Sequence, residues 1–426
     1  GFAMDAIQIY GGNCPEGQIK IQGSKNAVLP ILAATLLIDG TCEIKNCPII
    51  SDVHHMLRLM ESLCCTINRK GHTLTIDAAC LSRCDMPSDS VSVMRSSIML
   101  LGALLARTGS VSMQYPGGCV IGQRPIDLHL QGLRKMGVII EEKEDGFSAE
   151  AVRLTGAVHR LPFVSVGATE NLLLAAVLAH GDTVIENAAR EPEITALCDF
   201  LNTAGADIEG AGTNRILIHG VKKLHAISYR IPSDRVVAGT YLAACLCCGG
   251  EVFLKDAPGR QIVSVIKAAA AMGARIYESE DGIQVACRER RKMIPLLQTD
   301  SYPGFPTDLQ SAFLAAMTLA DGEGVLQETI FENRFRIVPQ LQKMGADIVC
   351  RDNTVYVKGR RKLHGAVLQA QELRGGAALV LAGSAAEGTT VVCNRHFIER
   401  GYEDICKDLG EIGIRCKKID YREYNG

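Results

Sequence analysis

The stretch from Pro116 to Asp127 combines residue types suited to chemistry on an anionic substrate. Glycines and prolines surround a single thiol, Cys119, and Arg124 follows five residues later. A thiol can act as a nucleophile or as a proton donor, and a nearby arginine can hold an anion while favouring the thiolate form. Segments this rich in glycine pack poorly and often carry function. The alternative is a small buried residue at a tight turn, which is the usual role of a free cysteine.

Basic residues also stand where the sequence predicts helices to begin. A helix N-terminus carries partial positive charge, so a basic side chain there is unfavourable unless an anion binds. If these helix starts converge, the cleft between them would suit a strongly anionic substrate. The cations expected to line that cleft are Lys25, Arg95, Arg124, Arg374 and Arg400. Taken singly, each of them has ordinary surface pairing as its alternative.

A recurring sequence motif predicts that the chain consists of repeats. A glycine that separates a helix-like from a strand-like segment recurs in steps of 68, 68, 72 and 68 residues, at Gly137, Gly205, Gly273, Gly345 and Gly413. A weaker first copy has Cys64 at the glycine position. A second landmark, glycine followed by a β-branched run, keeps the same period from Gly40 to Gly388. Two landmarks with one period predict six repeats of about 70 residues.

Each repeat is predicted to contain both helix and strand. An apolar helix leads through a glycine turn into a strand, and an amphipathic helix then ends at the recurring glycine before further strands. The first helix of each repeat, such as Val236–Cys248, is apolar almost all round and should be buried on every side. The predicted fold class is therefore α/β, with buried parallel core helices and with strands and amphipathic helices outside them.

The length of the chain favours two lobes, because 426 residues exceed one ordinary core. We expect three repeats in each lobe, with residues 24–232 in one lobe and residues 1–23 and 233–426 in the other. The N-terminal strand Ile7–Tyr10 would then supply the strand that the last repeat lacks.

Composition excludes several classes of protein. A net charge of −2 without a lysine or arginine block argues against a nucleic-acid partner. The longest apolar run, Val28–Ile38, is shorter than the roughly 18 residues of a membrane helix, so no membrane partner is expected. Seventeen cysteines without a secretory signal predict reduced thiols in the cytoplasm. Cys245 and Cys248 lack a second ligand pair, and phosphate-loop and dinucleotide motifs are absent from the sequence, so neither a metal nor a cofactor is predicted.

Seven motifs spread over the chain occur in one combination. They are Gly23–Ala27, Pro116–Asp127, Ser165–Thr169, Glu186–Ile194, Phe305–Asp308, Phe331–Phe335 and Arg400–Tyr402. From about Ile7 to Lys417, the chain closely resembles the UDP-N-acetylglucosamine 1-carboxyvinyltransferase family of enolpyruvyl transferases. The resemblance implies a two-lobed inside-out α/β barrel. It also implies transfer of the enolpyruvyl group of phosphoenolpyruvate to the 3-hydroxyl of UDP-N-acetylglucosamine with release of phosphate, the first committed step of peptidoglycan synthesis.

The resemblance further implies roles for individual residues. Cys119 would donate a proton to C3 of phosphoenolpyruvate and could form a covalent adduct with it, and Asp308 would take the proton of the sugar 3-hydroxyl. Phosphoenolpyruvate would be held by Lys25, Asn26, Arg124, Arg374 and Arg400. UDP-N-acetylglucosamine would contact Arg95, Arg124, Pro125, Ile126, Asp127, Leu128, Phe163, Val164, Ser165, Val166, Asp308 and Ile330. Such an acid and base permit addition followed by loss of phosphate without a metal or cofactor.

Two other functions are compatible with the repeat architecture. One is the sister activity on shikimate 3-phosphate, against which the Cys119 loop and the segment Ser165–Thr169 argue. The other is a non-catalytic paralogue that binds a UDP-sugar without turnover, which would show nucleotide-sugar binding and no phosphate release. Some family members carry a lysine near the position of Phe163, whereas here Phe163 and Val164 are apolar, which weakens the expected contact with the diphosphate.

Overall fold

The computed structural model describes residues 3–81, 84–85, 98–115, 126–331 and 335–422. The chain divides into two compact units, with Gly23–Pro232 in unit 2 and with Gly1–Gln22 and Ser233–Gly426 in unit 1. The chain therefore passes between the units twice, after Gln22 and after Pro232. Each unit has its own hydrophobic core.

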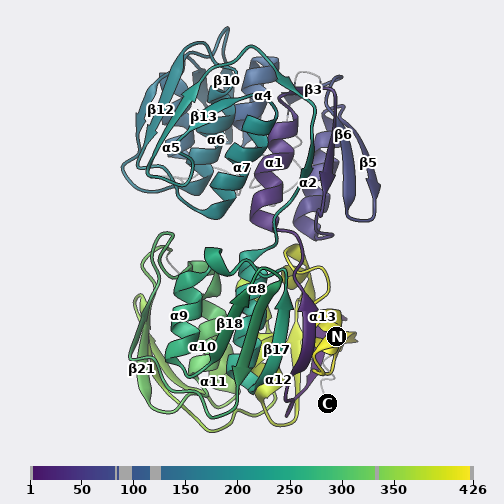
Figure 1. The fold of residues 1–426 in the computed structure, drawn as a ribbon, viewed down its shortest axis with the longest axis vertical. Coiled ribbons are helices and arrows are strands. Elements are labelled where there is room, and N and C mark those ends of the chain that lie inside the picture. Colours follow the sequence, from purple (N-terminus) through teal and green to yellow (C-terminus); the bar gives the residue numbers. More distant parts are fainter. Residues whose placement is uncertain (1–2, 82–83, 86–97, 116–125, 332–334, 423–426) are drawn as a thin grey trace. The chain divides into compact units, whose positions relative to one another are not determined.

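Unit 2 is built around three buried helices, and each of them is accompanied by a more polar one (Figure 1). The buried helices are α1 (Lys25–Thr35), α4 (Leu101–Thr108) and α6 (Val166–Ala176). The amphipathic helices are α2 (Ser51–Ser62), α5 (Asp127–Lys135) and α7 (Pro192–Thr203). In α6 every residue from Ala168 to Ala176 is buried, as an all-round apolar helix requires.

Unit 1 repeats this plan. Its buried helices are α8 (Arg235–Cys248), α10 (Gln310–Met317) and α12 (Leu373–Ala385). Its outer helices are α9 (Val263–Ala271), α11 (Ile337–Lys343) and α13 (Ile405–Glu411). Three short 3₁₀ helices are η1 (Gly259–Gln261), η2 (Thr307–Leu309) and η3 (Arg395–Arg400). The prediction of apolar core helices is confirmed in both units.

Within the part of the chain that the structure describes, six four-stranded sheets cover these helices, and all six share one pairing pattern. In each sheet one pair of neighbouring strands is parallel and the other two pairs are antiparallel. Six sheets of one topology confirm the six predicted repeats.

The sheets of unit 2 run in the order β16-β4-β6-β5, β7-β8-β10-β9 and β11-β12-β14-β13, and a short pair β15-β3 accompanies them. The strands of the first sheet and of the short pair are β16 (Ser228–Arg230), β4 (Thr41–Lys45), β6 (Thr73–Asp77), β5 (Thr66–Lys70), β15 (Leu224–His225) and β3 (Ile38–Asp39). Those of the second sheet are β7 (Cys84–Asp85), β8 (Ser110–Gln114), β10 (Gly146–Glu150) and β9 (Ile139–Glu142). Those of the third are β11 (Val158–Arg160), β12 (Asp182–Glu186), β14 (Arg215–His219) and β13 (Asp207–Glu209).

The sheets of unit 1 run in the order β18-β19-β17-β2, β20-β21-β23-β22 and β24-β25-β1-β26. The strands of the first are β18 (Arg275–Ser279), β19 (Gly282–Cys287), β17 (Gly250–Lys255) and β2 (Glu16–Lys20). Those of the second are β20 (Leu296–Gln298), β21 (Glu323–Gln327), β23 (Thr354–Lys358) and β22 (Asp347–Arg351). Those of the third are β24 (Val367–Gln369), β25 (Thr389–Cys393), β1 (Met4–Tyr10) and β26 (Cys416–Tyr421).

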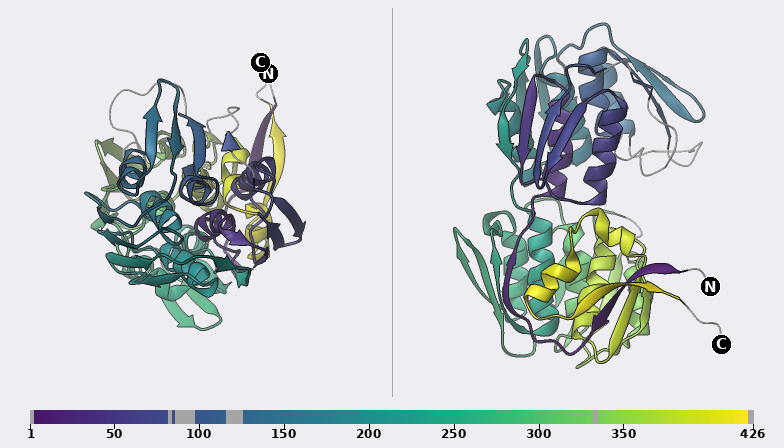
Figure 2. Two further views of the ribbon diagram at one scale, coloured as in Figure 1. Left: turned by 90° about the horizontal axis from the view of Figure 1, so that it is seen from above. Right: turned by 90° about the vertical axis from the view of Figure 1, so that its right-hand side faces the viewer.

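The N-terminal strand completes the last repeat, as the sequence predicts. β1 lies between β25 and β26 and pairs antiparallel with both, with Ile7 opposite Val392 on one side and Lys418 on the other. Figure 2 shows the two ends of the chain emerging from this sheet. The N-terminus and the C-terminus therefore stabilise the same sheet of unit 1.

Among the described residues, no helix combines the length and apolar character needed to cross a bilayer.

The recurring glycine follows the end of an amphipathic helix and adopts a left-handed backbone. Its φ angle lies between 83° and 108° at Gly137, Gly205, Gly273, Gly345 and Gly413. In the first repeat Cys64 takes the same place with a φ of 71°. A side chain in this conformation is strained, because its Cβ approaches backbone atoms that glycine avoids.

We expect Cys64→Gly to raise the free energy of unfolding by about 0.5–1 kcal/mol. Relief of a strain of about 1–2 kcal/mol exceeds the added unfolded-state entropy of glycine, about 0.4–1 kcal/mol. Urea denaturation followed by circular dichroism measures the change. Gly273→Ala is the matched control and should be destabilising. The added Cβ would meet nothing within 4 Å, so the only cost is the strain of an alanine backbone held at a φ of 97°. A loss of stability in Cys64→Gly would show that contacts of the thiol outweigh the strain.

Candidate active site

The first site segment of unit 2 is the start of α1, and local contacts fix its position. The Ser24 hydroxyl accepts a hydrogen bond from the backbone N–H of Ala27 at 3.1 Å and so caps the helix. Lys25 follows the cap, and its Nζ lies 3.0 Å from Asp52 Oδ2, with both side chains almost buried. Asn26, the next residue, is half-buried. The structure thus places the predicted phosphoenolpyruvate residues Lys25 and Asn26 in the first turn of α1, with a carboxylate that pairs with the lysine ammonium.

The start of α6 carries a second predicted segment. The Ser165 hydroxyl accepts from the N–H of Ala168 at 3.2 Å, and its carbonyl accepts the Thr169 hydroxyl at 2.7 Å. Val166 opens the helix and Val164 precedes the cap, both half-buried. Phe163 is 57% exposed, which is unusual for a large apolar side chain. The backbone N–H groups at this helix start are suited to an anion such as a diphosphate.

The start of α5 carries a third segment. Ile126, Asp127 and Leu128 form its first turn and are all half-buried. Residues with this degree of exposure can contact a ligand while the helix behind them is anchored in the core. The remaining predicted residues of unit 2, namely Arg95, Cys119, Arg124 and Pro125, lie outside the described residues.

In unit 1 the predicted base, Asp308, lies in the short helix η2 between two anchored neighbours. Leu309 is fully buried and packs against Gly239 of α8, where an added Cβ would lie 2.4 Å from a leucine methyl carbon. On the other side, the Thr307 hydroxyl donates to Glu328 Oε1 at 2.5 Å. Asp308 itself is half-buried. The turn is therefore anchored on both sides of Asp308, whose side chain stays partly exposed.

Glu328 connects this turn to the loop that carries Ile330. Its carboxylate accepts the Thr307 hydroxyl, the Thr299 hydroxyl at 2.7 Å and the backbone N–H of Ile330 at 2.8 Å, and Glu328 is only 2% exposed. A buried carboxylate with several donors is well satisfied and rigid. One buried side chain thus bonds to Ile330 and to Thr307, the neighbour of Asp308, and both Ile330 and Asp308 are predicted to contact the sugar nucleotide.

Arg374 lies in the first turn of α12 and is only 6% exposed. The Glu372 side chain caps this helix by accepting the backbone N–H of Arg374 at 2.8 Å and that of Gly375. The Arg374 guanidinium donates to the Tyr402 hydroxyl at 3.3 Å and lies over the tyrosine ring, 5.5 Å from its centroid. These contacts fix the direction of the guanidinium.

The charges around Arg374 keep it ionised in spite of burial. Desolvation lowers the pKa of Arg374, but the electrostatic effects of Tyr402, Asp308 and Asp234 together raise the pKa above its ordinary value. Asp308 therefore lies close enough to Arg374 to stabilise its charge. Within unit 1 the structure brings together the predicted base and a predicted phosphoenolpyruvate ligand.

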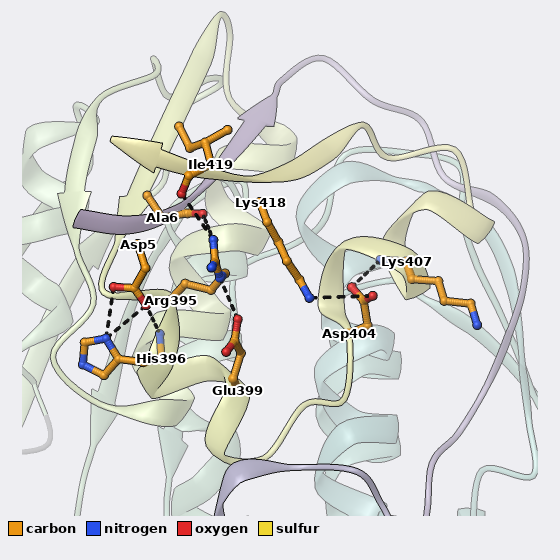
Figure 3. Close-up of polar contacts among 9 residues, drawn as sticks. All are labelled: Asp5, Ala6, Arg395, His396, Glu399, Asp404, Lys407, Lys418 and Ile419. Carbon is orange, nitrogen blue, oxygen red and sulfur yellow. Dashed lines mark hydrogen bonds and ion pairs between the residues drawn. The ribbon is translucent and has the colours of Figure 1, made fainter. Parts of the chain in front are cut away.

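Arg400 ends η3, a helix bound tightly to the terminal strands (Figure 3). Arg395 Nη1 donates to the carbonyls of Ala6 in β1 at 2.8 Å and Ile419 in β26 at 3.2 Å. Its Nε donates to Glu399 Oε1 at 2.6 Å, so the guanidinium spans all three elements. Arg400 is half-buried at the end of this anchored helix. The position of Arg400 therefore depends on β1 and β26, the first and last strands of the chain.

The turn after Arg400 is held by the last residue before the chain leaves unit 1. Gln22 Nε2 donates to the carbonyl of Gly401 at 2.9 Å, and Gln22 Oε1 accepts the N–H of Glu403 at 3.0 Å. Tyr402, between them, is buried and hydrogen-bonded to Thr240 at 2.7 Å as well as to Arg374. Arg374 and the residues that follow Arg400 are therefore coupled through Tyr402.

Several supporting residues were missed by sequence reasoning. Asp52, Glu328 and Glu372 all hold predicted site residues in place. Glu372 stands two residues before Arg374, but glutamate is not among the residues preferred as helix caps, so the sequence did not single it out. Asp52 and Glu328 are 27 and 21 residues from Lys25 and Thr307, and their partners could not be found from spacing alone.

Comparison with known proteins agrees with this architecture. Residues 9–409 match the family model for EPSP synthase (3-phosphoshikimate 1-carboxyvinyltransferase). The chain is 45% identical over 416 residues to UDP-N-acetylglucosamine 1-carboxyvinyltransferase 2 of Caldanaerobacter subterraneus subsp. tengcongensis, covering 98% of this chain and 100% of the relative. It is 43% identical over 420 residues to UDP-N-acetylglucosamine 1-carboxyvinyltransferase of Oleidesulfovibrio alaskensis, with the same coverage of each.

Two solved structures share the fold. The enolpyruvyl transferase NikO from Streptomyces tendae superposes with a TM-score of 0.88 at 24% identity, covering 99% of this chain and 100% of that one. EPSP synthase from Acinetobacter baumannii superposes with a TM-score of 0.74 at 19% identity, covering 97% and 100%. These likenesses confirm the predicted two-lobed inside-out α/β barrel.

Proposed function

The chain belongs to the EPSP synthase family of carboxyvinyltransferases, and we propose that it transfers the enolpyruvyl group of phosphoenolpyruvate to the 3-hydroxyl of UDP-N-acetylglucosamine. The observation that carries this choice of acceptor is the identity of 45% and 43% with two proteins named for that activity, over nearly the whole of each chain. The reaction would be the first committed step of peptidoglycan synthesis.

The arrangement of unit 1 supports the chemistry. Asp308 would take the proton of the sugar 3-hydroxyl as that oxygen bonds to C2 of phosphoenolpyruvate, and the Cys119 thiol would give a proton to C3. Loss of a proton from C3 and of phosphate from C2 then yields the enolpyruvyl ether. Arg374, together with Lys25, Arg124 and Arg400, would neutralise the phosphate and carboxylate of phosphoenolpyruvate, and Asn26 would donate a hydrogen bond to it. The charged state of Arg374 that its neighbours maintain suits this role.

Contacts with the UDP-sugar form the second part of the proposal. We assign them to Arg95, Arg124, Pro125, Ile126, Asp127, Leu128, Phe163, Val164, Ser165, Val166, Asp308 and Ile330. Support comes from four described segments, namely the starts of α5 and α6, η2 and the loop with Ile330, which hold most of these residues at partly or fully exposed positions. The exposed Phe163 offers an apolar surface where a lysine would have offered charge, so the N–H groups at the start of α6 would bear more of the diphosphate binding.

The proposed compartment is the cytoplasm, and the proposed partners are the two small-molecule substrates. Cys245 and Cys247 are buried free thiols, which suits a reducing environment. Burial raises the pKa of Cys247 to about 12, so this thiol stays protonated and inert at neutral pH.

Phosphate release tests the proposed function. The protein should release phosphate from phosphoenolpyruvate when UDP-N-acetylglucosamine is present and none when phosphoenolpyruvate is supplied alone. Shikimate 3-phosphate as the acceptor should give no phosphate, and release with it would favour the sister activity. Binding of UDP-N-acetylglucosamine without phosphate release under any condition would establish the non-catalytic paralogue instead.

A further inference from the structure

Asn171 lies in the middle of α6, is 1% exposed, and uses its side chain to join three segments of unit 2. Its Nδ2 donates to the carbonyl of Ile98 at 2.6 Å and to His129 Nδ1 of α5 at 2.8 Å. Its Oδ1 accepts the backbone N–H of Gly102 in α4 at 2.9 Å. A buried amide with this set of partners is a specific connection, because each lost bond would leave a polar group unsatisfied.

The partners of Asn171 also determine the tautomer of His129. Because the Gly102 N–H needs an acceptor and the Ile98 carbonyl needs a donor, the Asn171 amide has only one possible orientation. Its Nδ2 must then donate to His129 Nδ1, so the imidazole is neutral and carries its proton on Nε2. Burial lowers the pKa of His129 to about 4, which agrees with a neutral ring at physiological pH.

The helices at this junction are packed too closely to shift independently. An added Cβ at Gly102 would lie 2.3 Å from the Asn171 carbonyl oxygen, and one at Gly132 of α5 would lie 2.5 Å from a Leu172 methyl carbon. At Gly167, in the first turn of α6, an added Cβ would lie 3.1 Å from His129 Cε1. Thus α4 and α5 both approach α6 with no space for an extra methyl group, and the histidine ring lies against the start of α6.

Two of the joined segments lead directly to residues assigned to the UDP-sugar. His129 follows Ile126–Leu128 at the start of α5, and Asn171 lies six residues after Ser165, which is about 1.7 turns of helix. We propose that Asn171 and His129 are positioning residues that hold these two UDP-sugar-binding segments in a common register. The proposal rests on the proposed function, since it concerns binding of the same acceptor.

The test compares two substitutions of His129 that are similar in size. His129→Leu removes the acceptor for Asn171, whereas His129→Asn can place a carbonyl oxygen near the position of Nδ1. His129→Leu should raise KM for UDP-N-acetylglucosamine about tenfold, with kcat and KM for phosphoenolpyruvate changed less than about threefold. His129→Asn should restore KM for the sugar nucleotide to nearly its original value. If the leucine variant is insoluble, His129→Gln serves instead, because its amide lies nearer the position of Nε2.

A purely structural role would give a different result. In that case His129→Leu would lower the melting temperature and the active fraction and leave both KM values unchanged, which would overturn the proposal. Failure of His129→Asn to restore KM would also overturn it, because the acceptor at Nδ1 would then be irrelevant.

A second readout separates this proposal from the proposed function. If the unmodified protein releases no phosphate, the proposed function fails. Calorimetric titration with UDP then tests whether Asn171 and His129 position the nucleotide-binding segments. A Kd for UDP that is about tenfold weaker in His129→Leu than in His129→Asn would support it. Equal Kd values, or no binding of UDP by the unmodified protein, would overturn it.

Discussion

Replacing Asp308 by Asn should lower kcat for phosphate release about 10³-fold, while the Kd of UDP-N-acetylglucosamine changes less than about threefold. Asparagine has the same shape and can still bond to the sugar 3-hydroxyl, but it cannot take the proton. The flanking anchors Leu309 and Thr307 remain, so η2 should keep its place. Single-turnover phosphate release and calorimetric binding of the sugar nucleotide measure the two effects separately.

The matched control for this variant is Asp234→Asn. Asp234 also raises the pKa of Arg374, so its replacement removes a comparable negative charge near the guanidinium. Asp234 caps α8 by accepting the N–H groups of Val236 and Val237 at 2.9 Å, a role that asparagine performs equally well. Because an arginine side chain stays ionised in proteins and asparagine keeps the helix cap, Asp234→Asn should keep kcat within about threefold. An equal loss in both variants would mean that Asp308 acts through the charge of Arg374 and is not the base.

The repeat architecture could be predicted because it depends on features that are local in sequence. A helix end followed by a left-handed residue is specified within a few positions, so Gly137, Gly205 and their equivalents mark every repeat. At Cys64 the backbone adopts a φ of 71° although the residue is not glycine, so the repeat requires the left-handed conformation at this position. The period also predicted that β1 must complete the last sheet, because the last repeat is one strand short.

The contacts that hold the site could not be predicted, because their partners are brought together only by folding. Glu328 meets Thr299 and Thr307 across 29 and 21 residues, and nothing in the local pattern distinguishes it from a surface glutamate. Asn171 and Gly102 are 69 residues apart, which is close to one repeat. Core helices of neighbouring repeats are therefore in contact, and a polar residue in such a helix is a signal that could have been used.

The resemblance to a family supplied residue roles that geometry alone would not supply. The roles of Asp308 and Arg374 were implied by the resemblance, and the structure adds that Arg374 is buried, oriented by Tyr402 and close to Asp308. The structure also shows that the predicted cations have different partners. Lys25 is paired with Asp52 at 3.0 Å, whereas Arg374 faces a tyrosine and two carboxylates.

Replacing Cys119 by Ala should abolish phosphate release, with kcat reduced at least about 10³-fold. Without the thiol, C3 of phosphoenolpyruvate has no proton donor, so addition of the sugar oxygen at C2 would leave a carbanion. Binding of UDP-N-acetylglucosamine should persist, because the assigned contacts of the nucleotide do not include the thiol. Cys119 lies outside the described residues, so this expectation rests on its sequence context and on the chemistry of the reaction.

Alkylation with iodoacetamide gives an independent measurement of the same thiol. Burial raises the pKa of Cys198 and Cys247 to about 12, so these thiols should not react near neutral pH. Cys80 is exposed and should be alkylated without consequence, so Cys80→Ala is the control and should inactivate at the same rate as the unmodified protein. Inactivation by iodoacetamide should coincide with labelling of Cys119, whose reactivity an arginine five residues away should increase. If Cys119→Ala kept substantial activity, or if inactivation followed labelling of Cys80, another group would have to supply the proton to C3.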